Sequence, residues 1–171
     1  MKQKLEEADL LDLPDSLAWR LWLQAHYRSE SEAWLVFYKK HSGKPRIPYN
    51  DAVEEALCYG WIDSIVKRVD EERFAQRFSA RNPKTPYSQA NKERLRFLIQ
   101  QGKVVPEVLA ALGDFEDEPF VVPADILAAI LENERASENF QKFSDAYIRI
   151  RIAFIEGARK RPAEFEKRLR Y

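Results

Sequence analysis

The sequence predicts an α+β protein with a small antiparallel or mixed sheet, helices that cover the sheet, and an all-helical C-terminal segment. The expected order of elements is helix, strand, helix, strand, strand and then helices, so the strands all lie within residues 32–81. From residue 88 onward, apolar residues recur at the three- and four-residue spacing of helices. Strands concentrated in one part of a chain, rather than alternating with helices throughout, favour the α+β class.

The size and composition indicate a folded chain of one or two compact parts. It has 171 residues, of which 45% are hydrophobic and 33% charged, as is typical of a soluble protein with a well-formed core. We expect an α+β domain at residues 1–104 and a helical segment at 105–171 that packs on it, with one compact unit as the alternative.

The sequence shows no recognisable targeting signal or membrane-spanning segment. No apolar run approaches the ~18 residues that span a bilayer, and the polar N-terminal stretch lacks the core of a signal peptide. The cytoplasm is therefore the expected location. The lone Cys58 excludes an internal disulfide, which agrees with a reducing compartment.

Charge is balanced overall but unevenly distributed. Lys and Arg outnumber Asp and Glu by nine to four in residues 67–96 and by eight to three in residues 149–171, whereas residues 107–145 carry two positive and ten negative charges. Two interpretations stay open: the acidic connector packs across the basic parts, or one basic face recruits an anionic partner.

The first helix is expected to follow an N-cap at Asp15 or Ser16. Its buried stripe is expected at Leu17, Leu21 and Ala25, which recur at helical spacing.

The stretch "ALCYGWIDS" is expected to end the second helix and begin a strand. Asn50 is predicted to cap this helix, and Gly60 to end it in a left-handed conformation. Cys58 is expected to be buried and unreactive, because neither His26 nor His41 lies in a context that would activate it.

Helices in the second half are expected to begin near Pro106, Pro123, Ser144 and Pro162. The helix after Pro123 is expected to bury Leu127, Ile130 and Leu131. The stretch "YIRIRI" alternates like a strand, but its flanks are helical, so we expect a helix there. The acidic run at 114–118 is expected to be a solvated loop.

A row of arginines follows from the predicted hairpin of "WIDSIVKR" and "RFAQRFSAR". Alternation along a strand places Arg73, Arg77 and Arg81 on one face and Phe74 and Phe78 on the other. Such a row suits phosphates or carboxylates. The alternative is a solvated face of ordinary surface ion pairs.

The hairpin register decides whether Asp63 joins these arginines. In one register Asp63 pairs with Phe78 and faces away from them. In the other, Asp63 pairs with Ser79 and Trp61 with Arg81. Because a carboxylate buried beside Phe78 would need a partner, the sequence favours the second register.

Asn91 lies on the inner stripe of a helix that Ser88 is predicted to cap. An inward asparagine is either hydrogen-bonded in the core or placed beside a cleft. In the first case Asn91 ties down the preceding loop. In the second, Tyr87, Ser88 and Asn91 line the rim of a pocket that the arginines also reach.

No cofactor or metal is expected. One cysteine and two histidines lack the spacing of metal ligands. Neither a phosphate-binding loop nor a dinucleotide fingerprint is present.

The segments "WLVFYKK", "ALCYGWIDS", "RFSAR", "YSQAN" and "GKVVP" resemble, in this order, the YdeI/OmpD-associated family, also labelled bacteriocin-protection. The resemblance covers Trp19–Pro106, and "VPADILAAILENERASENFQKFS" resembles the C-terminal helical segment of that family. It implies a small α+β fold of the YjbR/CyaY-like superfamily. It also implies a role in stress or antimicrobial-peptide tolerance rather than a known reaction.

This chain departs from the family pattern near its end. Glu164 and Phe165 stand where the family tends to carry a Thr-Arg pair, while Arg168 is kept.

Three functions remain open. The preferred one is a non-enzymatic binding or adaptor module whose groove near Trp61, Arg77 and Arg81 recognises an anionic small molecule, peptide or protein. The second is an enzyme that acts on a small anionic substrate with Asp63 as acid/base and arginines as clamps. The third is binding of single-stranded nucleic acid through Tyr87 and the basic hairpin, which zero net charge disfavours. These patterns do not fix the oligomeric state.

Overall fold

In the computed structural model, residues 6–113 and 119–170 are described, and they group into two units. The first unit comprises residues 6–86 and 94–113, and the second comprises 87–93 and 119–170. The expected acidic loop at 114–118 lies outside the described residues. The first turn of the helix α3 (Gln89–Gln100) groups with the second unit and the remainder with the first.

The fold class predicted from the sequence is confirmed. The first unit contains β1 (Leu10–Leu11), α1 (Ser16–His26), β2 (Glu32–Tyr38), α2 (Tyr49–Cys58), β3 (Trp61–Arg68), β4 (Arg73–Ala80) and α4 (Pro106–Leu112), with 3-10 turns at Glu7–Asp9 and Lys40–Ser42. The second unit contains α5 (Ala124–Leu131), α6 (Glu134–Phe140), α7 (Asp145–Glu156) and α8 (Pro162–Leu169). The α4 helix, which lies beyond residue 104, groups with the first unit.

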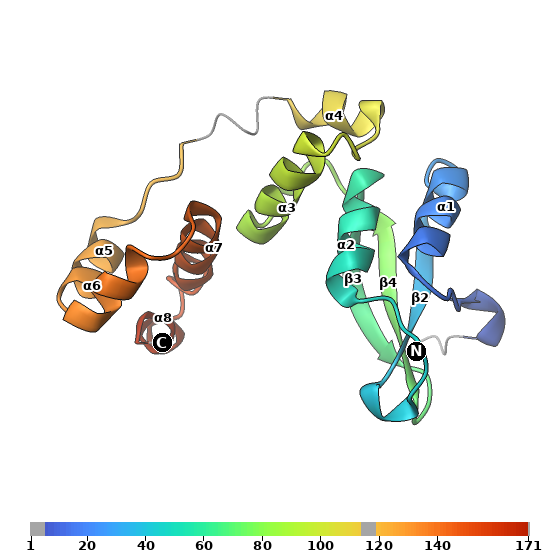
Figure 1. The fold of residues 1–171 in the computed structure, drawn as a ribbon, viewed down its shortest axis with the longest axis horizontal. Coiled ribbons are helices and arrows are strands. Elements are labelled where there is room, and N and C mark those ends of the chain that lie inside the picture. Colours follow the sequence, from blue (N-terminus) through green and yellow to red (C-terminus); the bar gives the residue numbers. More distant parts are fainter. Residues whose placement is uncertain (1–5, 114–118, 171) are drawn as a thin grey trace. The chain divides into compact units, whose positions relative to one another are not determined.

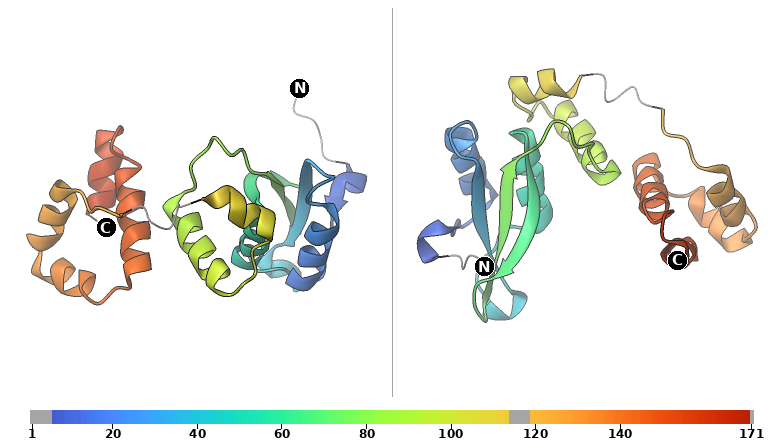
Figure 2. Two further views of the ribbon diagram at one scale, coloured as in Figure 1. Left: turned by 90° about the horizontal axis from the view of Figure 1, so that it is seen from above. Right: turned by 180° about the vertical axis from the view of Figure 1, so that it is seen from behind.

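The sheet of the first unit is mixed. Its strand order is β1-β2-β4-β3, with β1 parallel to β2 and the other pairs antiparallel. The helices α1 and α2 lie side by side on one face of this sheet (Figures 1 and 2). On that face the ring of Trp19 lies 5.3 Å from that of Phe78, and Tyr49 of α2 lies 6.4 Å from Phe37.

The buried face of α1 differs from the predicted one. Trp19 and Leu23 are fully buried, whereas Leu17 and Leu21 are 63% and 56% exposed. The sequence contains both stripes at helical spacing. The large indole of Trp19 decides between them, because it buries the most apolar area and donates a hydrogen bond to the Ala52 carbonyl at 3.1 Å.

The predicted end of α2 is confirmed, but its predicted beginning is not. The helix starts at Tyr49 directly after Pro48, so the predicted N-cap at Asn50 is wrong. Gly60 follows its end with φ +72°, and its N–H donates to the Leu57 carbonyl at 3.1 Å. The predicted left-handed stop at Gly60 is therefore confirmed.

A β-bulge sets the register of the hairpin. Near the turn, Val66 pairs with Gln76, which belongs to the register that the sequence favoured. The register then shifts by one residue, so Asp63 pairs with Phe78 instead of Ser79. The favoured register is thus wrong at Asp63, because the extra residue of the bulge moves the beginning of β3 by one position.

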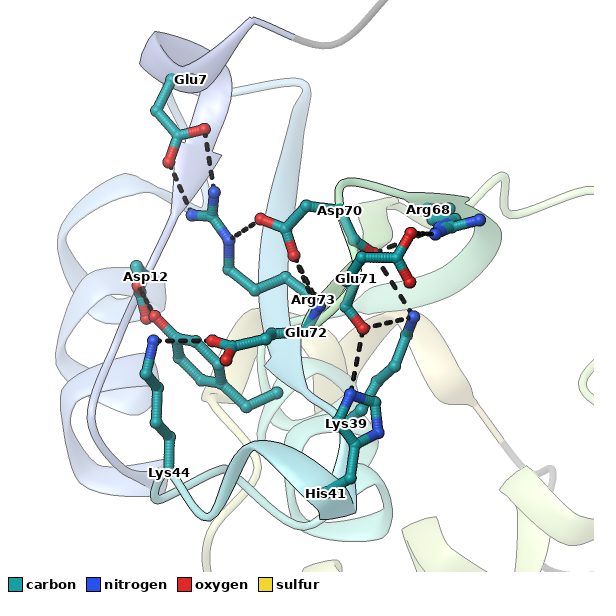
Figure 3. Close-up of polar contacts among 11 residues, drawn as sticks. Glu7, Asp12, Lys39, His41, Lys44, Arg68, Asp70, Glu71, Glu72 and Arg73 are labelled. Carbon is teal, nitrogen blue, oxygen red and sulfur yellow. Dashed lines mark hydrogen bonds and ion pairs between the residues drawn. The ribbon is translucent and has the colours of Figure 1, made fainter.

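Charged residues tie the hairpin turn to the N-terminal segment (Figure 3). Arg73 contacts the carboxylates of Glu7 at 2.6 Å and Asp70 at 2.7 Å. Lys39 donates to the carbonyl oxygens of Asp70 at 3.3 Å and Glu71 at 2.9 Å. These contacts raise the pKa of Arg73 through its bonds to Glu7 and Asp70, and the bond from Arg73 lowers the pKa of Asp70.

The core of the second unit is small and aliphatic. Ile126, Ile152 and Ile155 are its buried members. The partly buried residues around them are Phe120, Val122, Ile130, Phe140, Ile148, Phe165 and Leu169. Leu131, expected to be buried, is 58% exposed because α5 turns Ile126 inward instead.

The helical prediction for "YIRIRI" is confirmed by α7. Ser144 caps this helix by accepting from the N–H of Tyr147 at 3.3 Å. A separate helix, α6, follows α5 after an Asn133 cap, which the sequence reasoning did not anticipate.

Replacing Gly60 by Ala should destabilise the protein more than replacing Gly43 by Ala. Both glycines have positive φ, so each change costs about 1–2 kcal/mol of backbone strain. A Cβ at Gly60 would lie 3.1 Å from Val108 Cγ2, whereas a Cβ at Gly43 meets nothing within 4 Å. Chemical denaturation measures both free energies of unfolding, and equal losses would contradict the close approach to Val108.

Arg73→Gln should lower the melting temperature at pH 7, and this loss should shrink as the pH falls below the usual aspartate pKa of about 4. The folded pKa of Asp70 is depressed, so its stabilisation is present above the unfolded pKa and lost as the pH falls through the folded value. Arg46→Gln, at an exposed position, serves as the control. A melting-temperature difference that stays constant from pH 7 down through the acidic range would refute the role of the Asp70 pair.

Candidate functional site

The candidate side chains predicted from the sequence are divided between the two units. Those in the first unit are Trp61, Asp63, Arg77 and Arg81, and those in the second are Tyr87, Ser88 and Asn91.

Trp61 belongs to the core rather than to a binding surface. It is 1% exposed, and its indole N–H donates to the Tyr27 carbonyl at 3.2 Å. Its ring meets that of Trp22 edge-on at 5.9 Å. Trp61 therefore helps to hold α1 against β3.

Asp63 does not face the arginine row. Because it lies opposite Phe78, it shares the helix-covered face of the sheet, while Arg77 points to the other face. Its carboxylate accepts a hydrogen bond from the Tyr49 hydroxyl at 2.5 Å. Burial, followed by this bond, raises the pKa of Tyr49 to about 12. The partner that a carboxylate near Phe78 requires is thus Tyr49.

The arginine row already holds carboxylates of the same unit. Arg77 contacts Glu32 at 2.6 Å, and Arg73 contacts Glu7 and Asp70. Although burial opposes the shift, the bond from Arg77 holds the pKa of Glu32 below its usual range. Arg81 donates to the carbonyl oxygen of Thr85. This pattern matches the surface ion-pair alternative for Arg73 and Arg77.

The beginning of α3 agrees in part with its prediction. The Ser88 hydroxyl accepts from the N–H of Asn91 at 3.3 Å, so the predicted cap is confirmed. Asn91 is 7% exposed, as an inward asparagine should be, and Tyr87 is half-buried. That these residues line a pocket reached by the arginines stays a prediction.

A groove in the second unit combines apolar and cationic surface. It has a volume of about 730 Å³ and lies among α6, α7 and α8. Its apolar floor consists of Ile130, Phe140, Ile148, Ile152, Ile155 and Leu169. Its cations are Arg135, Arg151, Arg168 and Arg170. Among the described residues, no aspartate or glutamate lines it.

Two of these arginines lie against one aromatic ring. The guanidinium carbon of Arg168 lies 3.9 Å from the ring centroid of Phe154, and that of Arg151 lies 5.3 Å from it. Arg168 is further held by Glu164 at 2.8 Å and by the Phe154 carbonyl at 2.6 Å. The Glu164 carboxyl has a lowered pKa because it accepts this bond from Arg168.

Arg135 and Arg151 have no carboxylate within ion-pair distance in the described part of the chain. Beside them, Phe143 and Tyr147 are 45% and 44% exposed, and their rings lie 4.7 Å apart. The groove therefore offers positive charge and aromatic surface that the second unit itself leaves unused.

A second cleft, of about 530 Å³, lies beside Tyr59 in the first unit. Its arginines are engaged: Arg20 contacts Glu55 at 2.7 Å, and Arg28 pairs with Glu107. These pairs link α1 to α2, and the segment after α1 to α4, so this cleft is more simply explained as part of the packing than as an anion site.

The groove of the second unit was not among the sites predicted from the sequence, although two signals pointed to it. The excess of positive charge in residues 149–171 contains Arg151, Arg168 and Arg170. Phe143 and Tyr147 are two aromatic residues on either side of the predicted helix start at Ser144. What could not be foreseen was that α6, α7 and α8 would enclose a hollow.

Cys58 should react with iodoacetamide much more slowly in the native protein than in the unfolded chain. It is fully buried, and burial, reinforced by Glu55, raises its thiol pKa to about 11. Little thiolate therefore forms at pH 8. Mass spectrometry of alkylated protein, with and without guanidinium, measures the two rates. Fast modification of the native protein would contradict the buried, inert assignment.

Two family models match the chain at separate places. The model described as domain of unknown function (DUF8412) matches residues 11–111, and the model described as bacteriocin-protection, YdeI or OmpD-associated matches residues 119–171. The predicted resemblance is therefore confirmed for the C-terminal segment, whereas the stretch from Trp19 to Pro106 falls within the other match.

No curated protein and no solved structure matches the chain. Within the part of the chain that the structure describes, no helix combines the length and apolarity that crossing a membrane requires. Because the first model covers more than half of the sequence, the chain belongs to the DUF8412 family of unknown function, and its C-terminal segment is similar to the bacteriocin-protection, YdeI or OmpD-associated family.

Proposed function

We propose that this protein is a non-enzymatic binding module that recognises an anionic ligand through the arginine-lined groove of its second unit. One observation carries the proposal: four arginines surround an apolar floor, and no acidic residue among those described lines it. An adaptor role in stress or antimicrobial-peptide tolerance is the context that similarity of the C-terminal segment to the bacteriocin-protection family suggests.

The two kinds of surface select a ligand that is both anionic and apolar. Burying apolar area contributes about 25 cal/mol per Å². Guanidinium groups form paired hydrogen bonds with carboxylates, sulfonates or phosphates, and these bonds strengthen where the ligand excludes water. The volume of about 730 Å³ lies in the range of ligand pockets.

The same chemistry is less available at the site proposed from the sequence. An anion at Arg77 would have to displace Glu32, which is already paired at 2.6 Å. An acid/base role for Asp63 with arginine clamps would need the carboxylate and Arg77 on one face of the sheet. These contacts support a binding module over the enzymatic alternative.

The double substitution Arg135→Gln and Arg151→Gln should weaken binding of anilinonaphthalene sulfonate about tenfold or more. Each guanidinium supplies a charge-assisted hydrogen bond to the sulfonate, and a loss of 1.4 kcal/mol corresponds to about tenfold in affinity. Fluorescence titration of the full chain measures the dissociation constant. Arg161→Gln, an exposed arginine of the same unit outside the groove, should leave it unchanged.

A neutral analogue, N-phenylnaphthylamine, separates the charge effect from the apolar one. Its affinity should not change in the double variant, because the floor is intact. Equal sulfonate binding by the wild type and the double variant would refute the proposal. Preferential binding of an oligothymidylate that is abolished by Tyr87→Ala would instead support the single-stranded nucleic-acid alternative.

A further inference from the structure

We infer that the partner of this groove is an acidic amphipathic helix of another protein. The inference rests on the proposed function and narrows its ligand class. Three features of the groove support it: the distribution of charge, the shape of the floor, and the residue types at the rim.

The positive charges of the groove come from three different helices. Arg135 lies on α6, Arg151 on α7, and Arg168 on α8. Arg168 is already paired with Glu164, so the positions open to a ligand are Arg135 and Arg151. A single anionic head group can neutralise one of them, whereas a helix with several glutamates or aspartates can reach both. The number and separation of the arginines therefore favour a polyvalent anion over a single-headed amphiphile.

The floor of the groove follows one face of α7. Tyr147, Ile148, Arg151, Ile152 and Ile155 all line it, at the three- and four-residue spacing of one helix face. Eight residues separate the first from the last of them, which corresponds to about 12 Å along a helix. A partner helix that presents apolar residues at i, i+4 and i+7 has an apolar stripe of nearly the same length, about 10 Å.

The residue types at the rim are those of protein interfaces. Arginine and aromatic residues are enriched at the energetic centres of such interfaces, and lysine is depleted. All the cations that line the groove are arginines, although the same unit carries exposed lysines at Lys142 and Lys160. Phe143 and Tyr147 are half-exposed, and a docked helix would cover them.

Part of the site is organised before the partner arrives. Arg168 is 18% exposed and held by Glu164, by the Phe154 carbonyl and by the Phe154 ring. Arg151 lies over the same ring. Arg151 is thus ordered without a carboxylate partner, so it loses less side-chain entropy on binding, which favours tight recognition of carboxylates. A single-stranded nucleic acid would supply the charge but not the aliphatic stripe that the isoleucine floor requires.

The test is fluorescence anisotropy with a labelled helical peptide of about four turns. The peptide carries leucines at i, i+4, i+7 and i+11 and glutamates on the flanking positions. A second peptide has the same composition, with leucines and glutamates exchanged in position so that no stripe forms. The full chain should bind the patterned peptide at least about tenfold more tightly than the scrambled one, and more weakly as salt concentration rises.

Substitutions locate the binding in the groove. Phe143→Ala combined with Tyr147→Ala should reduce affinity for the patterned peptide about tenfold or more. Phe97→Ala, an equally exposed phenylalanine on α3, is the matched control and should have no effect. Arg135→Glu combined with Arg151→Glu should reject the glutamate peptide and bind a version with lysines in place of the glutamates. This exchange of preference would also establish that the variant is folded.

The outcomes separate this inference from the function on which it rests. If anilinonaphthalene sulfonate binds in an arginine-dependent way, but the two peptides bind equally or not at all, the inference of a helical partner is overturned while the binding function stands. If neither the sulfonate nor the peptides depend on Arg135 and Arg151, both are overturned.

Discussion

The left-handed turn at Gly60 joins every layer of the first unit. Its N–H donates to the Leu57 carbonyl of α2, and its carbonyl accepts from the N–H of Arg81 at the end of β4. Two residues before Gly60, the carbonyl of Cys58 accepts a hydrogen bond from the N–H of Val105, which joins the end of α2 to the residue just before α4. A Cβ at Gly60 would press on Val108 of α4. Helix, sheet and the α4 segment are therefore positioned by a conformation that glycine adopts without strain.

In the described part of the chain, most arginines that form ion pairs hold a carboxylate of their own unit, but two arginines of the second unit do not. In the first unit, Arg73 and Arg77 hold carboxylates of neighbouring segments and so contribute to folding. In the second, Arg135 and Arg151 lie beside aromatic and aliphatic surface without an acidic partner among the described residues. An arginine that is paired within the fold must lose that partner before it can bind an anion, whereas an unpaired one at an apolar surface does not. This difference moves the candidate site from the sheet to the helices.

Sequence signals were reliable where the structure depends on interactions between residues close together in the chain. The caps at Ser88 and Ser144 and the stop at Gly60 depend on hydrogen bonds and backbone angles within a few residues, and all are present. Signals that depended on distant partners were less reliable. The pattern allowed two buried faces for α1, and only contact with Phe78 and Ala52 selected the one that contains Trp19.

The sequence by itself determined the α+β class, most helix boundaries, the burial of Cys58 and the excess of positive charge near the C-terminus. The tertiary structure alone decided the position of Asp63, because a bulge of one residue turns its side chain to the opposite face. The tertiary structure alone also decided which arginines form ion pairs with carboxylates. Ion pairs join residues far apart in the chain, as Arg77 joins Glu32, and no local pattern encodes such a distance.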